Sequence, residues 1–320
     1  MEKFKKFNLN QTHEMKYFFE KYGYLHIKNV YKKEELLEYL EKDINKADIS
    51  KDLTCYPNLN KLINNKKLIS TMNYVLGGNL QYCFDSSLNV NMKTDQKYPF
   101  YKLLHRDNQD GFDLNSYFPV IRCGVYFHDF TKFSGGPKIA ISSHKNEFFF
   151  LNIGLTKLIK FILRLSDFGC KYIYQKRTNQ NNYIDPNHNK YPHKINIKNI
   201  KIFPKYVNMY PEIGDLILWN LRAYHQGYAK KLKYFPSICL SALYERFLPN
   251  FLFEKKITNR KAAFFVLLGN TTLTNEYVEN RIKYINKDHW NFLPNKKILN
   301  ELKEKGLKCI TLGYDKNQFS

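Results

Sequence analysis

Two histidines and one aspartate stand at positions in the sequence where their side chains could bind a metal ion. His105 and Asp107 directly follow the apolar run FYKLL, so both side chains leave the end of a strand on the same side. His225 follows the apolar run Asp215–Trp219, which a Gly-Asp turn opens. Two imidazoles and one carboxylate on a β-scaffold are the donor set of mononuclear non-haem Fe(II) centres, which keep three coordination positions for other ligands. The spacing therefore predicts a metal site made of His105, Asp107 and His225.

Four other histidines favour structural roles. His128 and Asp129 could imitate a metal pair, but they end a β-type run that is typical of a barrel wall. His144 lies in a turn with the sequence SHK, which favours a loop contact. His188 and His193 lie in a polar segment that is typical of a protein surface.

The elements that must position these residues change in character near Gly78. Before it, apolar residues at helical spacing predict helices over His13–Tyr22, Lys32–Ile44 and Asn65–Leu76, and the alternating run Tyr24–Val30 predicts a short strand. After it come short β-type runs separated by polar turns: Gln81–Phe84, Ser87–Met92, Phe100–Leu104, Val120–Phe127, Lys138–Ile141, Lys201–Val207, Asp215–Trp219, Ile238–Tyr244 and Ala263–Leu268. Many short strands predict a sandwich or jelly roll, and the absence of a glycine-rich phosphate loop disfavours nucleotide-binding α/β folds.

We expect a mainly β fold with helical additions (α+β), in which a double-stranded β-helix (jelly roll, cupin-like) core is flanked by N- and C-terminal helices. One domain would span residues 1–320, with a helical layer over 1–80, the core over 81–270 and a helical extension over 271–320. An insertion at 146–206 interrupts the core. It contains a basic amphipathic helix at Leu155–Leu165 and a polar loop at Thr178–Asn199. A lid over the substrate entrance fits this insertion better than a membrane-surface helix does.

Composition limits the class of protein and its partners. The net charge of +22 comes mostly from lysines spread along the whole chain beside abundant Asn and Ile. This pattern is typical of compositional drift, so nucleic acid is a possible partner but not the favoured one. Six cysteines without a C-x-x-C pair indicate reduced thiols in a cytoplasmic protein. The sequence has neither a secretory signal nor an apolar run long enough to span a membrane.

Four segments, in the same order, resemble the phytanoyl-CoA dioxygenase-like family of Fe(II)/2-oxoglutarate-dependent oxygenases across roughly residues 15 to 270. They are FFEKYGYLHIKNVYKKEELLEYLEKDI, LLHRD, FSGGPKIAISSHK with Ser142 in place of the usual Gly, and YPEIGDLILWNLRAYHQG. The resemblance implies that His105, Asp107 and His225 bind iron and that 2-oxoglutarate and O₂ are co-substrates. It also implies a small-molecule, acyl or sugar-type substrate. The carboxylate of Asp107 favours hydroxylation or desaturation, because related halogenases lack it.

One position departs from the family pattern. Ser237 stands where family members usually have an Arg that binds the distal carboxylate of 2-oxoglutarate. Arg260, which precedes the apolar run Ala263–Leu268, is the first substitute, and Arg222 and Lys233 come next. Each has a structural alternative: a solvated surface position for Arg260 and Lys233, and a contact with a carboxylate such as that of Asp215 for Arg222. Ser237 therefore leaves a catalytically inactive jelly-roll binding protein open as an alternative, and the net charge of +22 leaves a nucleic-acid-modifying oxygenase open as another.

Overall fold

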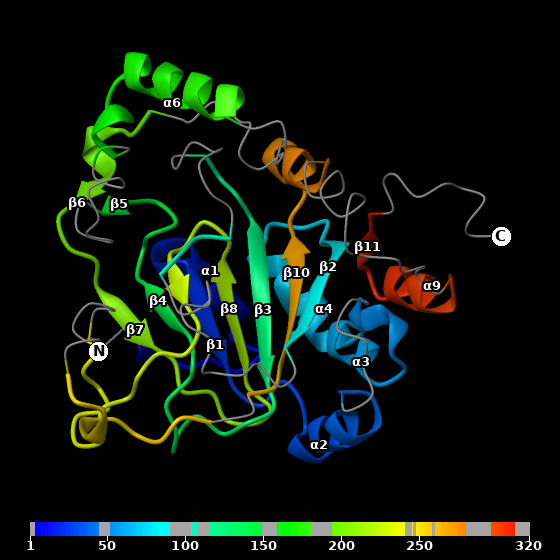
Figure 1. Ribbon diagram of the computed structural model, residues 1–320. Coiled ribbons are helices and arrows are strands. Elements are labelled where there is room, and N and C mark those ends of the chain that lie inside the picture. Colours follow the sequence, from blue (N-terminus) through cyan, green and yellow to red (C-terminus); the bar gives the residue numbers. More distant parts are fainter. Residues whose placement is uncertain are drawn as a thin grey trace.

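The computed structural model describes residues 4–44, 52–89, 104–107, 116–148, 159, 161–180, 194–240, 245, 248–257, 260–279 and 296–310. Helices and strands are mixed, so the fold is α+β (Figure 1). The helices are α1 (Thr12–Tyr22), α2 (Lys33–Lys42), α3 (Asn60–Ile63), α4 (Lys66–Val75), α6 (Asp167–Gln180) and α9 (Lys296–Glu304). The strands are β1 (Tyr24–Ile27), β2 (Gln81–Asn89), β3 (Val120–Tyr126), β4 (Lys138–Ala140), β5 (Glu147–Phe148), β6 (Ile200–Lys201), β7 (Tyr206–Asn208), β8 (Leu216–Asn220), β9 (His225–Gln226), β10 (Ala262–Leu268) and β11 (Lys308–Cys309).

The strands form one large sheet and two small ones. The large sheet has the order β1-β8-β3-β10-β2-β11, and its neighbours are antiparallel except for β11, which runs parallel to β2. A second sheet has the order β7-β4-β9, and β5 pairs with β6. Figure 1 shows the long strands of the large sheet side by side, with α9 and β11 at its far edge and α6 beyond the strand ends. Strands β3 and β10 are central and almost wholly buried.

The N-terminal helices pack on the large sheet as the apolar spacing predicts. Met15, Phe18 and Phe19 are the buried residues of α1, and they join the main hydrophobic core together with residues of β1 and β8. The helix ends where Gly23 adopts φ 81° and its N–H donates to the carbonyl of Phe19. Among the described residues, no helix has the length and apolar character needed to cross a bilayer.

Three strand predictions need correction. The runs Gln81–Phe84 and Ser87–Met92 are one strand as far as Asn89, with an irregular register against β10 and a positive φ at Phe84. The predicted strand Lys201–Val207 is two strands, because Pro204 has no N–H to donate and restricts the residue before it. Residues 238–240 of the predicted strand Ile238–Tyr244 are irregular, and the rest of that strand lies outside the described residues.

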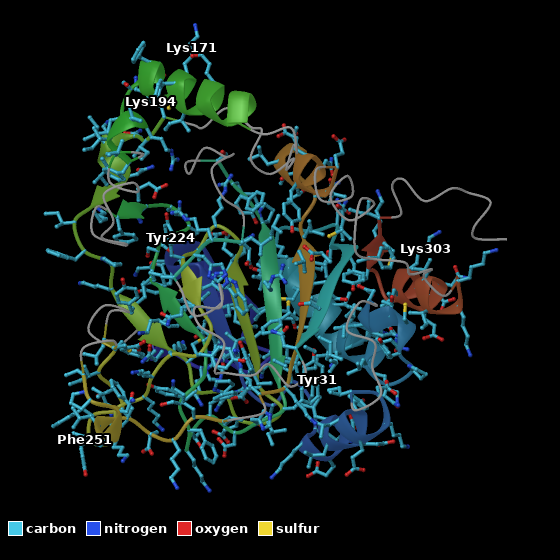
Figure 2. The ribbon with its side chains drawn as sticks, viewed as in Figure 1. Tyr31, Lys171, Lys194, Tyr224, Phe251 and Lys303 are labelled. Carbon is cyan, nitrogen blue, oxygen red and sulfur yellow. The ribbon has the colours of Figure 1, made fainter. Side chains whose placement is uncertain are left out.

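The insertion and the C-terminal segment also differ from expectation. The long helix of the insertion is α6, and it includes the first residues of the predicted polar loop Thr178–Asn199. The expected helix Leu155–Leu165 is helical at 159 and 161–163, and its start lies outside the described residues. The tail after Asn275 is not helical throughout, because β11 joins the edge of the large sheet. Figure 2 shows Lys171 and Lys194 near α6 and Lys303 on α9, so lysines occur on widely separated parts of the molecule.

Candidate metal centre

Backbone pairing brings the two predicted histidines together. His105 forms an isolated antiparallel bridge with His225, in which each N–H donates to the other residue's carbonyl, at 2.9 and 2.8 Å. On its other side, His225 pairs with Ile139 of β4. The ring centroids of the two histidines lie 4.4 Å apart. The position of His225 is therefore fixed by strand pairing on both sides.

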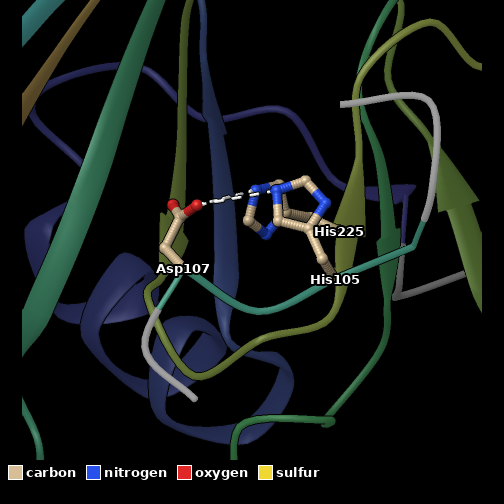
Figure 3. Close-up of side chains that lie close together, drawn as sticks. All are labelled: His105, Asp107 and His225. Carbon is tan, nitrogen blue, oxygen red and sulfur yellow. Dashed lines mark ion pairs between the residues drawn. The ribbon is translucent and has the colours of Figure 1, made fainter. Parts of the chain in front are cut away.

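The carboxylate of Asp107 completes the cluster. Its Oδ1 lies 3.6 Å from Nε2 of His105 and 3.5 Å from Nε2 of His225 (Figure 3). One donor atom from each of the three residues lies within 4.8 Å of the other two. Figure 3 shows the Asp107 side chain pointing toward both imidazoles. The structure thus brings all three predicted ligands to one point.

Hydrogen bonding and burial leave His225 neutral, with its Nε2 lone pair available to a metal. Its Nδ1 lies 3.1 Å from the carbonyl of Ala223, which favours the tautomer with the proton on Nδ1 and leaves Nε2 as the donor. Burial lowers the pKa of His225 to about 4, so the ring is neutral at neutral pH. Its ring lies 5.0 Å from that of Trp219 on β8, so the small sheet that carries His225 faces the large sheet.

Asp107 is held in its charged form. Burial alone would raise its pKa, but His225, Arg122 and His105 together keep the pKa well below its ordinary value. Arg122 was not among the predicted site residues. Its Nε lies 3.1 Å from Oδ2 of Asp107. An Arg within the otherwise apolar run VIRCGVY was the sequence signal that could have indicated it.

The family-like motifs around the cluster have structural roles. Gly214 has φ 104°, and a Cβ there would lie 2.5 Å from the carbonyl oxygen of Tyr31. The Asp215 carboxylate lies 2.7 Å from Nε2 of His26 and accepts a hydrogen bond from the N–H of Asn29. Ser142, where the sequence resemblance leads us to expect a Gly, adopts φ 59°.

The three proposed cationic anchors lie in different places. Arg260 lines the same cavity of about 140 Å³ as the three metal-site residues, together with Tyr126 and Tyr228. Arg222 lines a different cavity and donates to the carbonyl of Ser116, not to Asp215 as one alternative held. Lys233 is exposed. Of the three, Arg260 alone shares the cavity of the cluster within the described part of the chain.

Arg260 is buried and surrounded by aromatic rings, not solvated. It is 3 % exposed. Its guanidinium carbon lies 4.3 Å from the ring centre of Tyr228, 5.1 Å from that of Tyr126 and 5.9 Å from that of Phe130. Its Nε has no hydrogen-bond partner among the described residues. Ser237, where the sequence resemblance places an Arg, is exposed and lines a separate groove.

Comparison with known proteins gives structural likenesses only. No protein-family model matches the sequence. No curated protein matches it either. A solved structure of SnoN, a non-haem α-ketoglutarate-dependent epimerase from nogalamycin biosynthesis, is 12 % identical with a TM-score of 0.45, over 82 % of this chain and 84 % of that chain. HygX from Streptomyces hygroscopicus with iron bound is 16 % identical with a TM-score of 0.44, over 80 % and 86 % of the two chains. SnoK, a carbocyclase from the same biosynthesis as SnoN, is 15 % identical with a TM-score of 0.42, over 80 % and 83 %.

Proposed function

We propose that the protein is a mononuclear non-haem Fe(II), 2-oxoglutarate-dependent oxygenase that hydroxylates or otherwise oxidises a small molecule. The observation that carries this proposal is the convergence of His105, Asp107 and His225, whose donor atoms lie within 4.8 Å of one another. Two neutral imidazole donors and one anionic oxygen are the donor set that Fe(II) takes in oxygenases of this kind. Bound Fe(II) would supply the oxidising chemistry, with 2-oxoglutarate and O₂ as co-substrates.

The three side chains would have distinct tasks. Nε2 of each imidazole would bind the metal as a neutral donor, and the Asp107 carboxylate would balance part of its charge. Trp219 and Arg260 line the same cavity as these three residues, so a metal held there would have both side chains as neighbours. The cavity volume of about 140 Å³ is below the roughly 300–1,000 Å³ of pockets for drug-sized ligands, so its described part suits a small acid.

Arg260 would bind the distal carboxylate of 2-oxoglutarate. A guanidinium stays charged in proteins, and burying it without a counter-ion is costly. Arg260 has that environment here, with aromatic neighbours and no ion pair to a carboxylate within the described residues. A dicarboxylate that binds the metal at one end and Arg260 at the other would supply the missing charge. The planar fork of Arg can meet both carboxylate oxygens at once, which a Lys cannot do.

A double-stranded β-helix is the fold that we propose for residues 81–270. Two sheets support it: the large sheet carries Trp219 and Arg122, and the β7-β4-β9 sheet carries His225, whose ring lies 5.0 Å from that of Trp219. The carboxylate at Asp107 supports hydroxylation or desaturation, since it occupies the position that a halide would need. We propose an acyl or sugar-type substrate that reaches the cavity from the side of β2, where the lining residues Ser87 and Asn89 are partly exposed.

Turnover of 2-oxoglutarate tests the proposal. The wild type, loaded with Fe(II) in air, should convert 2-oxoglutarate to succinate even without the true substrate, at a slow uncoupled rate. His225→Ala should abolish this turnover and keep the fold. His144→Gln is the matched control, because His144 is equally buried but lies in another cavity. Metal binding without any turnover would indicate a binding protein instead, and equal turnover in His225→Ala would refute the proposed metal centre.

A further inference from the structure

The two oxygens of the Asp107 carboxylate face different partners. Oδ1 faces the two imidazoles, 3.6 and 3.5 Å from their Nε2 atoms. Oδ2 faces away from them and lies 3.1 Å from Nε of Arg122. A carboxylate can bind a metal through one oxygen or through both, so the partner of the second oxygen decides which mode is open.

Arg122 also contacts a second carboxylate, that of Asp85. It belongs to β3, and one of its terminal nitrogens lies 3.7 Å from Oδ2 of Asp85 on the β2 strand. The same Asp85 oxygen accepts a hydrogen bond of 2.8 Å from the hydroxyl of Tyr277, in the helical residues 272–279. The Tyr277 ring packs edge-on against Phe118, with centroids 6.1 Å apart. A continuous path, Tyr277–Asp85–Arg122–Asp107, therefore joins the C-terminal segment to the metal centre.

Asp85 and Arg122, in the middle of this path, are largely shielded from water. The side chains of Arg122 and Asp85 are 15 % and 3 % exposed, so water screens their attraction only weakly. The guanidinium lies between two carboxylates and presents a different nitrogen to each. Both contacts are ion pairs; a Lys could offer only one point charge at this place, whereas the guanidinium spreads its charge over nitrogens that face both carboxylates.

Arg122 and Arg260 line the same cavity but differ in their partners. Arg260 has aromatic neighbours and no ion pair to a carboxylate among the described residues, which suits it to an incoming acid. Arg122 already contacts two protein carboxylates, one of which belongs to the metal centre. This arrangement suits a side chain that acts through Asp107 and does not bind a ligand directly.

We propose that Arg122 is a positioning residue whose charge holds Oδ2 of Asp107 in an ion pair, so that Asp107 offers a metal only Oδ1. One-oxygen binding leaves one more coordination position for the keto-acid end of a co-substrate and for an exchangeable ligand. Asp85 and Tyr277 hold Arg122 in place, which gives the C-terminal segment a part in the metal centre. This inference rests on the proposed function, because it requires a metal at the three ligands.

The Co(II)-loaded protein gives a readout that does not depend on activity. X-ray absorption counts the oxygen ligands of the metal, and the visible spectrum of Co(II) reports its coordination number. Arg122→Met removes both contacts and keeps an unbranched stem. We expect one additional oxygen ligand, a changed visible spectrum, and a loss of roughly 10- to 100-fold in Co(II) affinity or in 2-oxoglutarate turnover.

Tyr277→Phe is the milder variant, since it removes only the hydroxyl that donates to Asp85. It should change the Co(II) spectrum in the same direction by a smaller amount. Tyr82→Phe is its matched control: Tyr82 is also buried and donates to a carboxylate, that of Asp52, at 2.6 Å, but Asp52 contacts Thr54 and Ser86 and not Arg122. Its Co(II) spectrum should match that of the wild type.

The outcomes separate this inference from the proposed function. A wild-type protein that does not bind Co(II), or a His225→Ala variant that binds it equally well, contradicts the proposed function. If His225→Ala loses Co(II) while Arg122→Met and Tyr277→Phe keep the wild-type spectrum, the inference alone is overturned. Lost 2-oxoglutarate binding with an unchanged spectrum in Arg122→Met also overturns it, because Arg122 would then bind the co-substrate directly. Circular dichroism checks that each variant folds. If Arg122→Met does not fold, the Co(II) spectrum of Tyr277→Phe tests the inference in its place.

Discussion

Replacing Arg260 with Gln should weaken the binding of 2-oxoglutarate far more than that of a keto acid with a single carboxylate. The guanidinium is 3 % exposed and ringed by Tyr228, Tyr126 and Phe130, so water can do little to replace it. Truncating one partner of a buried, hydrogen-bonded charge pair costs about 2–5 kcal/mol. Since each 1.4 kcal/mol is a factor of ten, the dissociation constant should rise roughly 30- to 4,000-fold.

The assay is calorimetric titration of the anaerobic Fe(II)-loaded protein with two ligands. 2-Oxoglutarate has a distal carboxylate, and 2-oxopentanoate has a methyl group at the same end of an otherwise equal chain. Arg260→Gln should raise the dissociation constant of 2-oxoglutarate at least about 30-fold. It should change that of 2-oxopentanoate little, because this ligand has no charge for Arg260 to meet. Iron affinity should be preserved, since Arg260 is not one of the three metal ligands.

Arg222→Gln is the matched control for this experiment. Arg222 is likewise 3 % exposed and stacked on an aromatic ring, with its guanidinium carbon 4.4 Å from the centre of Phe118. It lines another cavity, so its replacement should leave both dissociation constants unchanged. Normal 2-oxoglutarate binding in Arg260→Gln would refute the reasoning. An equal loss for both ligands would also refute it, because the effect would then come from distortion of the site and not from the lost charge.

Three further predictions concern stability and partners. Burial lowers the pKa of His144 to about 3 in the folded protein, whereas an unfolded His titrates near 6.5. As the pH drops from about 6.5 toward 3, a proton binds His144 in the unfolded chain only, so the free energy of unfolding falls. Urea unfolding should therefore show about 2 kcal/mol less stability at pH 5 than at pH 7 from this group, a difference that His144→Gln should remove. Gly23→Ala should cost about 2 kcal/mol or more, because Gly23 has φ 81° and an added Cβ would lie 2.3 Å from Nδ1 of His144; equal urea midpoints would contradict this. Binding of RNA or DNA should be weak at physiological salt, as measured by fluorescence anisotropy, and tight binding with a steep salt dependence would favour the nucleic-acid-modifying alternative.

Local pattern was enough to predict much of the fold. The apolar spacing of α1, α2 and α4 gave these helices to within a few residues, and the apolar runs gave β3, β8 and β10. The errors in the predicted strand bounds come from single residues whose effect the apolar pattern does not show. Phe84 takes a positive φ inside a strand, and Pro204 divides what reads as one strand. Strand β11 forms because it pairs with the edge strand β2, and the polar sequence of the C-terminal segment does not indicate this pairing.

The candidate site could be predicted only in part, because its geometry depends on contacts far apart in the chain. The H-x-D spacing and the run before His225 indicate metal ligands, but only the backbone bridge between His105 and His225 brings them together. Arg260 was proposed from its place ahead of an apolar run. Arg122 was missed because the run VIRCGVY reads as a barrel wall, and its role depends on Asp85, a residue of another strand.

A crystal structure of the protein soaked anaerobically with Fe(II) and 2-oxoglutarate tests the central claim most directly. We expect iron at about 2.0–2.3 Å from Nε2 of His105, Oδ1 of Asp107 and Nε2 of His225, as for first-row metals generally. We also expect the keto-acid end of 2-oxoglutarate on the iron and its distal carboxylate on Arg260. Iron bound elsewhere, or a cavity that takes up neither iron nor 2-oxoglutarate at saturating concentrations, would contradict the proposed oxygenase.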